Sequence, residues 1–355
     1  MKILRQILFP FSFIYWVITA IRNKMYDSGF IGSTEFDVPI IAVGNLNTGG
    51  SGKTPIIEYL IRAFYGEQFM AVLSRGYKRQ TYGFIEAEPE PNPKTIGDEP
   101  ALYKWKYPEL AVAVGEERVM AIPLIMSKYQ ELDLILVDDA FQHRAVRPWV
   151  QVLVTSYLNP FWKDQILPVG NLREVRSGYK RAQIIIVTNC PAQMDDIEKE
   201  KIHQKIKIVD NQRLFFFTNQ YSSPFLLENP MEHCSLNTVD DVLLFAGIAQ
   251  PAALKQYVSK EIKTLHWMSF PDHHWYDEED LYRIKRHFVS ISSTKKIILT
   301  TEKDAIRLWA FVPLLKKEGI NIYVLPMRSM PVKGEENKFL QLIQNSLAFF
   351  HNERS

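Results

Sequence analysis

The sequence predicts an α/β protein built on a P-loop, with a doubly wound and mostly parallel sheet, followed by a second, smaller α/β domain. Three observations support this. A glycine-rich loop separates an apolar run from a helix start, short apolar runs alternate with helical segments, and the alternation restarts near residue 215. A chain of 355 residues is long enough for two domains. The predicted divisions are 1–28, 29–218 and 219–355.

The glycine-rich loop reads VGNLNTGGSGKTP and covers residues 43–55. An apolar strand is expected before it, and a helix with proline in its first turn after it. Backbone N–H groups of such a loop and of the helix N-terminus form a cradle for phosphate. Lys53 is expected to reach the β- and γ-phosphates, and the Thr54 hydroxyl to bind Mg²⁺. The predicted nucleotide-binding residues are Asn47, Thr48, Gly49, Gly50, Ser51, Gly52, Lys53 and Thr54.

One position departs from the Walker A pattern, because Asn47 stands where glycine is usual. Asparagine tolerates a left-handed backbone, so we expect the loop to close. A plain glycine-rich turn would look similar, but the register of Gly52, Lys53 and Thr54 favours a phosphate loop.

The overall composition excludes several classes of protein. The chain is 46% hydrophobic and 23% charged, with a net charge of +2, so we expect a globular protein with no nucleic-acid partner. Cys190 and Cys234 lie far apart without metal-ligand spacing, which indicates a reducing compartment. Nothing in the sequence indicates an obligatory protein partner.

The N-terminus carries an apolar run, ILFPFSFIYWVITAI at residues 7–21. Lys2 and Arg5 precede it, and Arg22 and Lys24 follow it. A full span needs about 20 apolar residues, so the run is short. One interpretation is a helix that lies in, or dips into, a membrane interface; the other is a helix packed on the core. Basic residues at both ends favour the membrane.

Strands and helices are expected to alternate along both parts of the chain. In the first part we expect strands at 38–43, 70–73, 111–114, 132–137, 150–154 and 184–187, with helices at 101–105 and 118–128. In the second part we expect strands at 242–245, 296–300 and 322–325, with helices at 284–288 and 336–350. A proline-rich and acidic stretch, 80–100, reads as a loop. Ligands of such sheets bind beyond the carboxyl ends of the strands.

Two pairs of carboxylates are candidates for chemistry. Asp138 and Asp139 end an apolar strand, as a Walker B carboxylate does, and are expected to bind Mg²⁺ directly or through water. A solvated strand end is the alternative. Asp98 and Glu99 stand at a helix start, where acids complement the helix dipole. A base for an attacking hydroxyl is the other interpretation, and the residue types do not decide between them.

Two further segments carry polar groups. Asp272, His273 and His274 follow Pro271 in the stretch PDHH, which fits a carboxylate–imidazole base, a zinc site or a capping turn. Arg173 and Glu174 lie in LPVGNLREVRSG, where a guanidinium suits phosphate recognition and a surface loop is the alternative.

Together these residues resemble one family, the tetraacyldisaccharide 4'-kinases of lipid A biosynthesis. The resemblance covers most of the chain and rests on motifs in this order: VGNLNTGGSGKTP, SRGYKR, GDEP, DDAFQHR, LPVGNLRE, FAGIAQP, PDHH and TEKD. It implies two α/β domains joined by a hinge, with ATP on the first. It also implies an N-terminal membrane anchor at the cytoplasmic face of the inner membrane, and transfer of the γ-phosphate of ATP to the 4'-hydroxyl of a lipid A disaccharide precursor.

The resemblance also implies roles for individual residues. Asp98 looks like the catalytic base, assisted by His273, and Lys53 holds the phosphates. The remaining implied roles are an Mg²⁺ set of Thr54, Asp138 and Asp139, active-site groups near the phosphate and the metal at Arg173 and Glu174, and support from His143.

Two other classes stay open on the residues alone. A P-loop ATPase or GTPase that acts as a switch or metallochaperone would share the Walker loops, and the Asp-His-His stretch would relay its metal. A non-catalytic binding module at a membrane would not need Lys53.

Overall fold

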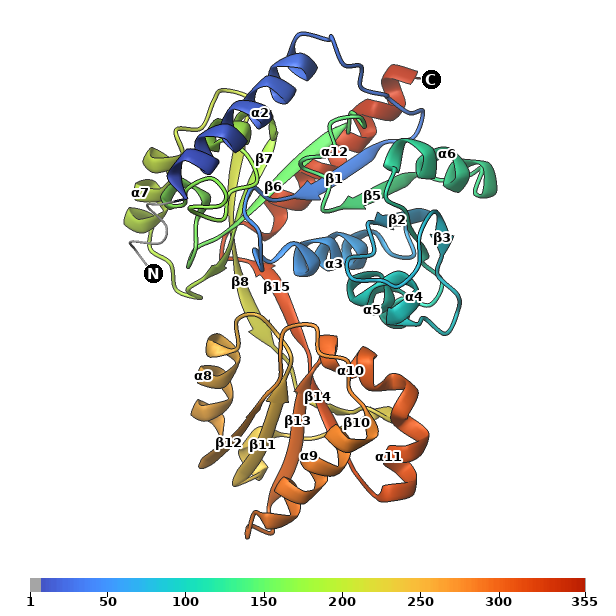
Figure 1. The fold of residues 1–355 in the computed structure, drawn as a ribbon, viewed down its shortest axis with the longest axis vertical. Helices are drawn as coiled ribbons and strands as arrows, with labels where there is room; N and C mark the ends of the chain where they lie inside the picture. Colours follow the sequence, from blue (N-terminus) through green and yellow to red (C-terminus); the bar gives the residue numbers. More distant parts are fainter. Residues whose placement is uncertain (1–7, 355) are drawn as a thin grey trace.

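The computed structural model describes residues 8–354, which form a nine-stranded sheet and a six-stranded sheet (Figure 1). Both sheets are largely parallel and are covered by helices, so the predicted α/β class is confirmed. Residues 1–7 lie outside the described part of the chain. They include Lys2 and Arg5, the basic residues that precede the apolar N-terminal run.

The larger sheet carries the phosphate loop near its middle. Its strand order is β15-β8-β7-β6-β1-β5-β2-β4-β3, and in the described chain only β3 and β15, at the two edges, pair antiparallel to their neighbours. β1 and β5 are buried along their whole length and are apolar except for Asp138 at the end of β5, because helices cover both faces of the sheet. The bounds are β1 Ile40–Gly44, β2 Met70–Ser74, β3 Ile85–Glu86, β4 Ala111–Val114, β5 Leu134–Asp138, β6 Val150–Ser156, β7 Ile184–Cys190, β8 Arg213–Tyr221 and β15 Met327–Pro331.

Alternate residues of these strands face opposite sides of the sheet. Ile41 and Val43 of β1 join the apolar cluster under α3, α5 and α12, whereas Ile40 and Ala42 join the cluster under α6. The sheet is therefore doubly wound, as predicted. The helices of this unit are α3 Lys53–Phe64, α4 Pro93–Ile96, α5 Asp98–Lys106, α6 Arg118–Lys128, α7 Asp196–Ile206 and α12 Glu336–Arg354.

The smaller sheet has the order β10-β9-β14-β13-β11-β12, with β11 to β14 parallel. Its strands are β9 Phe225–Leu226, β10 Asn229–His233, β11 Asp241–Ala246, β12 Thr264–Ser269, β13 Lys296–Thr301 and β14 Ile322–Leu325. Its helices are α8 Ala252–Glu261, α9 Glu278–Ser290, α10 Glu302–Leu308 and α11 Val312–Glu318.

The end of the chain returns to the larger sheet, which differs from the predicted division at 219–355. β15 pairs antiparallel with β8, and α12 packs Phe339, Ile343 and Leu347 into the core of the first unit. The returning helix buries its apolar stripe there, and β15 extends the sheet edge beside β8. β8 and β15 are thus the two connections that lead from one sheet to the other (Figure 1).

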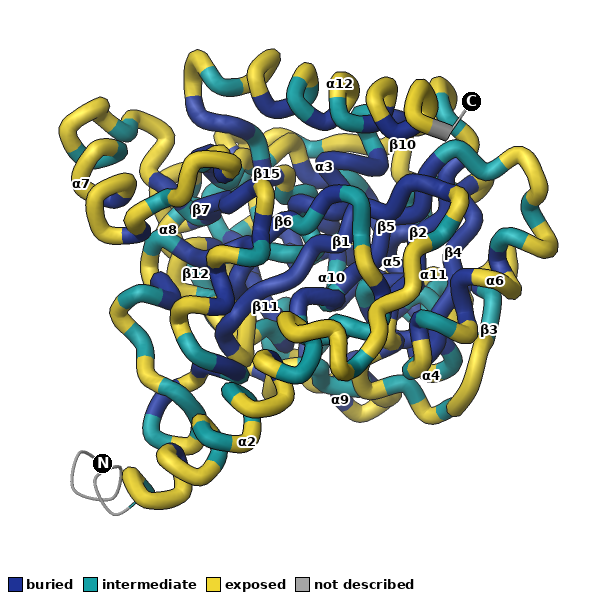
Figure 2. The backbone as a smooth tube through the Cα atoms, turned by 90° about the horizontal axis from the view of Figure 1, so that it is seen from above, coloured by how far each residue is buried: buried dark blue, intermediate teal, exposed yellow. Residues whose placement is uncertain are grey.

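The N-terminal helix α2, Phe9–Asp27, lies at a corner of the molecule with much of its surface exposed (Figure 2). Its exposed side chains as far as Ile21 are apolar: Phe9 is 65% exposed, Phe13 58% and Ile18 60%. Its buried residues, Ser12 and Asn23, are polar. This inverts the usual pattern of a surface helix. Among residues 8–354, no helix has the length and apolar character needed to cross a bilayer.

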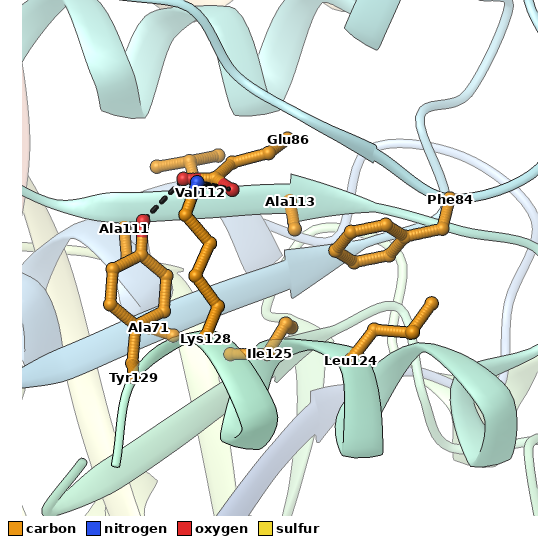
Figure 3. Close-up of a pocket in the computed structure, with 10 residues that line it drawn as sticks. All are labelled: Ala71, Phe84, Glu86, Ala111, Val112, Ala113, Leu124, Ile125, Lys128 and Tyr129. Atoms are coloured by element: carbon orange, nitrogen blue, oxygen red, sulfur yellow. Dashed lines mark hydrogen bonds and ion pairs between the residues drawn. The ribbon is translucent and has the colours of Figure 1, made fainter. Parts of the chain in front are cut away.

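The stretch 80–100, expected to be a loop, contains β3 and α4. Beside β3, a small pocket opens between β4 and α6 (Figure 3). Glu86 closes one side of this pocket by binding Lys128 and the Tyr129 hydroxyl. None of the predicted site residues lines it.

Candidate active site

The phosphate loop connects β1 to α3 and has the geometry of an anion cradle. α3 begins at Lys53, so the N–H groups of its first turn face the loop. Gly52 has φ +86°, and a Cβ there would lie 2.9 Å from Thr188 Oγ1. The same hydroxyl donates a 2.6 Å hydrogen bond to the Ser51 carbonyl. Only glycine fits this position, and the strand β7 therefore fixes the shape of the loop.

Asn47 closes the loop in a different way from the one expected. It is not among the residues with positive φ, so its tolerance of a left-handed backbone is not used. Instead its Nδ2 donates a 2.8 Å hydrogen bond to Asp164 Oδ2. The departure from glycine is therefore compatible with an ordinary backbone conformation.

Lys53 reaches the second aspartate of the predicted Walker B pair. Its Nζ lies 3.2 Å from Asp139 Oδ1 and donates a 3.0 Å hydrogen bond to Asn45 Oδ1. Arg173 Nη1 lies 3.0 Å from both oxygens of Asp139. Burial raises the pKa of Asp139, but the charges of Lys53 and Arg173 outweigh it and lower the pKa to about 2. Asp139 therefore stays ionised and holds two cations beside the loop.

Asp138 lies deeper at the end of β5. Its Oδ1 accepts a 2.8 Å hydrogen bond from the Asp139 N–H, and its Oδ2 accepts one of 3.3 Å from the Tyr103 hydroxyl. Burial raises the pKa of Tyr103, and the Thr54 side chain is close enough to the Tyr103 hydroxyl to oppose this. Burial, with Asp139 and Glu99 nearby, raises the pKa of Asp138 to about 6, although the charge of Lys53 opposes this.

Thr54 and Asp138 therefore lie close to one another around Tyr103, a donor set that suits Mg²⁺. In the described chain, no three His, Cys, Asp or Glu residues form a metal-binding cluster. Mg²⁺ at phosphate-transfer sites binds through one or two protein ligands and the phosphates themselves, so Thr54 and Asp138 would be enough protein ligands for it.

Glu174, predicted near the metal, is buried behind Arg173. Arg181 binds both of its oxygens at 2.8 and 2.9 Å. Asn23 of α2 donates to Oε2 at 2.8 Å, and Gln142 donates to Oε1 at 3.1 Å. These contacts tie the loop to α2. A role of Glu174 on the metal stays a prediction.

Asp98 and His273 come together although 175 residues separate them. The His273 Nδ1 lies 2.7 Å from Asp98 Oδ2. Asp98 opens α5, whereas His273 precedes α9 and has φ +62°, a left-handed conformation that is uncommon outside glycine. Burial alone would raise the pKa of Asp98. The hydrogen bond from His273 and the charge of Arg307 lower it by more than burial raises it, so the pKa of Asp98 is below its usual value. Because the ionised carboxylate only accepts, Nδ1 carries a proton.

The neighbouring imidazole has another partner. His274 Nε2 lies 2.6 Å from Asp280 Oδ2, so the two histidines bind separate carboxylates. This arrangement does not favour the alternative in which both hold zinc.

The sequence did not single out Arg118, a polar group beside the Walker B carboxylates that contacts the expected supporting residue His143. Arg118, almost fully buried, donates to His143 Nε2 at 3.2 Å, so that nitrogen accepts. Burial and the charges of Arg118 and Arg75 lower the pKa of His143 to about 4. Burial also lowers the pKa of Arg118 to about 10. No local pattern around Arg118 signalled this contact, because its partners come from other elements.

A family model described as tetraacyldisaccharide-1-P 4'-kinase matches residues 4–348. The chain belongs to this family. The predicted family and its kinase activity are therefore confirmed.

Relatives named tetraacyldisaccharide 4'-kinase align over nearly the whole chain. The one from Flavobacterium johnsoniae is 39% identical over 344 residues, which is 97% of this chain and 98% of its own. The one from Bacteroides thetaiotaomicron is 38% identical over 347 residues, covering 95% and 91%.

A solved structure shares the fold over the same extent. It is LpxK from Aquifex aeolicus in complex with ATP, 27% identical, with a TM-score of 0.74. The alignment covers 97% of this chain and 99% of that one. The described arrangement of both sheets is thus that of a tetraacyldisaccharide 4'-kinase.

Proposed function

We propose that this chain transfers the γ-phosphate of ATP to the 4'-hydroxyl of a tetraacyldisaccharide 1-phosphate, a lipid A precursor. The observation that carries the proposal is the position of α5. Its first residue, Asp98, pairs with His273, and five residues later Tyr103 contacts Asp138 of the phosphate site. One short helix therefore links a base for the acceptor hydroxyl to the groups that bind the donor.

Phosphoryl transfer needs positioning and charge neutralisation more than covalent help. Lys53 and the N–H groups of the loop bind the phosphates. Arg173 moves from Asp139 to the transferred phosphoryl group and neutralises charge there. Thr54 and Asp138 would hold Mg²⁺, which would supply further positive charge at the phosphate oxygens. We assign Asp139 to the orientation of Lys53 and Arg173 because it contacts both.

The acceptor hydroxyl needs a base within hydrogen-bond reach. The sequence-based assignment made Asp98 the proton acceptor and His273 its assistant. Asp98 Oδ2 already accepts from His273 and Arg307, and the pKa of Asp98 is lowered, which makes it a weak base. We therefore place proton transfer at His273 Nε2, with Asp98 fixing the ring and stabilising its charged form.

We place the enzyme at the cytoplasmic face of the inner membrane, held there by α2. The apolar side chains of this helix point away from the protein and suit an interface with lipid. Its polar side touches the active-site loop, where Tyr15 donates a 2.8 Å hydrogen bond to the Arg173 carbonyl. A lipid substrate would thus meet the site without leaving the bilayer.

We further propose that the two sheets belong to domains that rotate about a hinge formed by β8 and β15. Ion pairs cross the interface between α5 and α10. Lys106 lies 2.7 Å from Glu302, and Lys303 lies 2.7 Å from Glu99. His273 and Asp98 are in contact in this structure, and opening about the hinge would separate them.

The test is transfer of label from γ-³²P-ATP in micelles that contain the lipid acceptor. A kinase moves the label to the lipid, and Lys53→Ala abolishes this. Release of inorganic phosphate without labelled lipid would favour a switch or metallochaperone. Lipid binding with neither product would favour a non-catalytic module.

A further inference from the structure

Three segments that lie far apart in the sequence converge on Asp304, which is fully buried. Its Oδ1 accepts hydrogen bonds from the Gly247 N–H at 3.0 Å, the Tyr276 hydroxyl at 2.8 Å and Arg307 Nη1 at 3.0 Å. Its Oδ2 accepts one of 2.6 Å from the Thr301 hydroxyl. The segments FAGIAQP, PDHHWY and TEKDAIRL therefore meet at one carboxylate.

Gly247 connects Asp304 to the segment that carries His273. Its carbonyl accepts a 3.1 Å hydrogen bond from the His273 N–H and one of 3.0 Å from Arg307 Nη1. A Cβ on Gly247 would lie 2.8 Å from the Pro271 carbonyl and 3.2 Å from Asp304 Oδ1. The chain at Gly247 is thus packed directly against the segment that holds His273.

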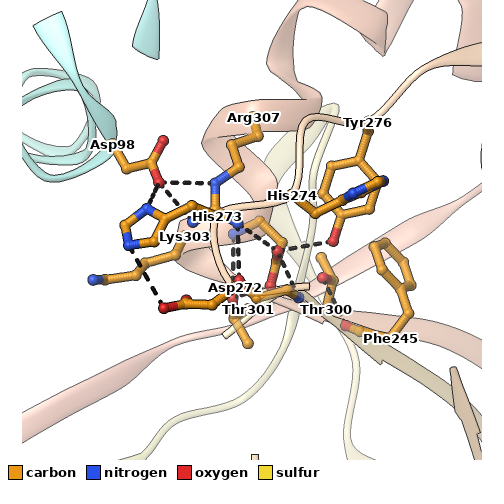
Figure 4. Close-up of polar contacts among 12 residues, drawn as sticks. Asp98, Phe245, Asp272, His273, His274, Tyr276, Thr300, Thr301, Lys303 and Arg307 are labelled. Atoms are coloured by element: carbon orange, nitrogen blue, oxygen red, sulfur yellow. Dashed lines mark hydrogen bonds and ion pairs between the residues drawn. The ribbon is translucent and has the colours of Figure 1, made fainter. Parts of the chain in front are cut away.

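Arg307 connects this cluster to the other base residue. Its side chain is 1% exposed, and Nε and Nη2 lie 2.9 and 2.6 Å from Asp98 Oδ2 (Figure 4). The same oxygen accepts from His273 Nδ1. The guanidinium therefore fixes both partners, His273 through Gly247 and Asp98 directly.

We propose that Arg307 is a positioning residue, which orients the Asp98–His273 base. The inference rests on the proposed function. Arg307 on α10 and His273 before α9 belong to the unit of the smaller sheet, and Asp98 on α5 belongs to the unit of the larger one. The base is therefore complete only when the two units meet. A buried ion pair is by itself weak evidence for stability, whereas the fork of arginine fixes a carboxylate in one orientation.

The charge of Arg307 gives the proposal a readout in pH. Removing this charge raises the pKa of Asp98, so the Asp98–His273 pair takes up a proton at a higher pH. The acidic limb of the pH profile of kcat therefore moves to higher pH. The other charged groups around the pair are unchanged by the substitution. They are Glu99 on α5, Lys303 and Asp304 on α10, Asp272 beside His273, and Lys78, whose Nζ lies 3.5 Å from the Asp272 carbonyl.

The experiment compares Arg307→Met with Arg307→Lys. We expect Arg307→Met to lower kcat about 100-fold, the size of a general-base contribution, with KM for ATP within about twofold of the parent. Its acidic limb should move to higher pH. Arg307→Lys keeps the charge, so it should recover much of kcat and leave the limb in place. Arg307→Gln, which is neutral but polar, is the second variant if Arg307→Met does not bind ATP.

Two lysines supply controls. Lys106→Met weakens the same interface without touching Asp98, since Lys106 binds Glu58 and Glu302. Lys285→Met removes a distant ion pair to Glu318. Both should leave the acidic limb unchanged.

An unaltered kcat in Arg307→Met would overturn the proposal. It would also be overturned if Arg307→Met and Lys106→Met lowered kcat equally and neither moved the acidic limb of the kcat profile. So would loss of ATP binding in both neutral variants. A parent enzyme that labels no lipid would instead overturn the proposed function.

Discussion

The side-chain amide of Asn23 donates a 2.8 Å hydrogen bond to Glu174 Oε2, and this contact joins the N-terminal helix to the active-site loop. Arg144 donates to the Asn23 carbonyl at 2.8 Å, and Arg22 donates to the Gln142 carbonyl at 3.0 Å. The polar face of α2 is therefore packed against the rest of the protein. Its apolar face is left for another partner, which we take to be lipid.

This division of faces makes the membrane test specific. Replacing Phe9, Phe13 and Ile18 together with serine should release the enzyme from vesicles, because it removes exposed apolar surface. ATP binding should stay normal, since the polar contacts of α2 are kept. Vesicle co-sedimentation measures the effect.

Met231→Ser is the matched control, since Met231 is an exposed apolar residue on β10 of the smaller sheet. If the triple variant still pellets as fully as the control, α2 is not the anchor. Deletion of residues 1–24 is a less selective test, because it also removes Asn23 and its bond to Glu174.

Lys53→Ala should lower kcat at least about 100-fold, because lost stabilisation of charge on the transferred phosphate costs a few kcal/mol. It also leaves Asp139 with Arg173 as its remaining cation. The fold should survive, as judged by circular dichroism. Lys128→Ala removes a surface lysine paired with Glu86 and should leave kcat unchanged. Lipid phosphorylation near the parent rate in Lys53→Ala would contradict the role of the loop.

His143 gives a prediction about stability and pH. Its pKa is about 4 in the folded protein, against about 6.5 in an unfolded chain. The unfolded chain therefore takes up a proton first as the pH falls. The stability that neutral His143 provides is present above pH 6.5 and is lost as the pH falls from 6.5 to 4.

Glutamine at this position does not titrate and still accepts from Arg118. We therefore expect the Tm of His143→Gln to rise relative to the parent between pH 8 and pH 4.5. His203→Gln, on an exposed position of α7, controls for loss of a histidine as such. A difference in Tm that is the same at every pH would exclude His143 as the responsible group.

The sequence predicted the central strands well, because continuous apolar runs such as those of β4 and β5 are buried on both faces. β12 and β15 were missed: β12 is half-exposed at a sheet edge, and β15 pairs with a strand about 110 residues away. The family motifs led to Asp98 and His273. Arg307 was not predicted, because its partner Asp98 lies 209 residues away and only the tertiary fold shows the contact.

The contact between Asp98 and His273 leads to a double-mutant cycle. Residues that act as one unit show non-additive losses, since removing either already disables the pair. We expect Asp98→Ala and His273→Ala each to lower kcat about 100-fold or more, the range of general-base catalysis. The double variant should lose little beyond the worse single one. ATP affinity should stay close to normal in all three, because neither residue belongs to the phosphate loop.

The chain contains a matched control for this cycle. His274 and Asp280 form a second imidazole–carboxylate pair in the same segment, at 2.6 Å, without contact to Asp98. Their alanine variants should change Tm more than kcat, because they remove a partly buried hydrogen bond and not a base. Fully multiplicative losses for Asp98 and His273 would separate the two residues. In that case His273 would position the substrate or the turn, and Asp98 would accept the proton alone, through the oxygen that Arg307 and His273 leave free.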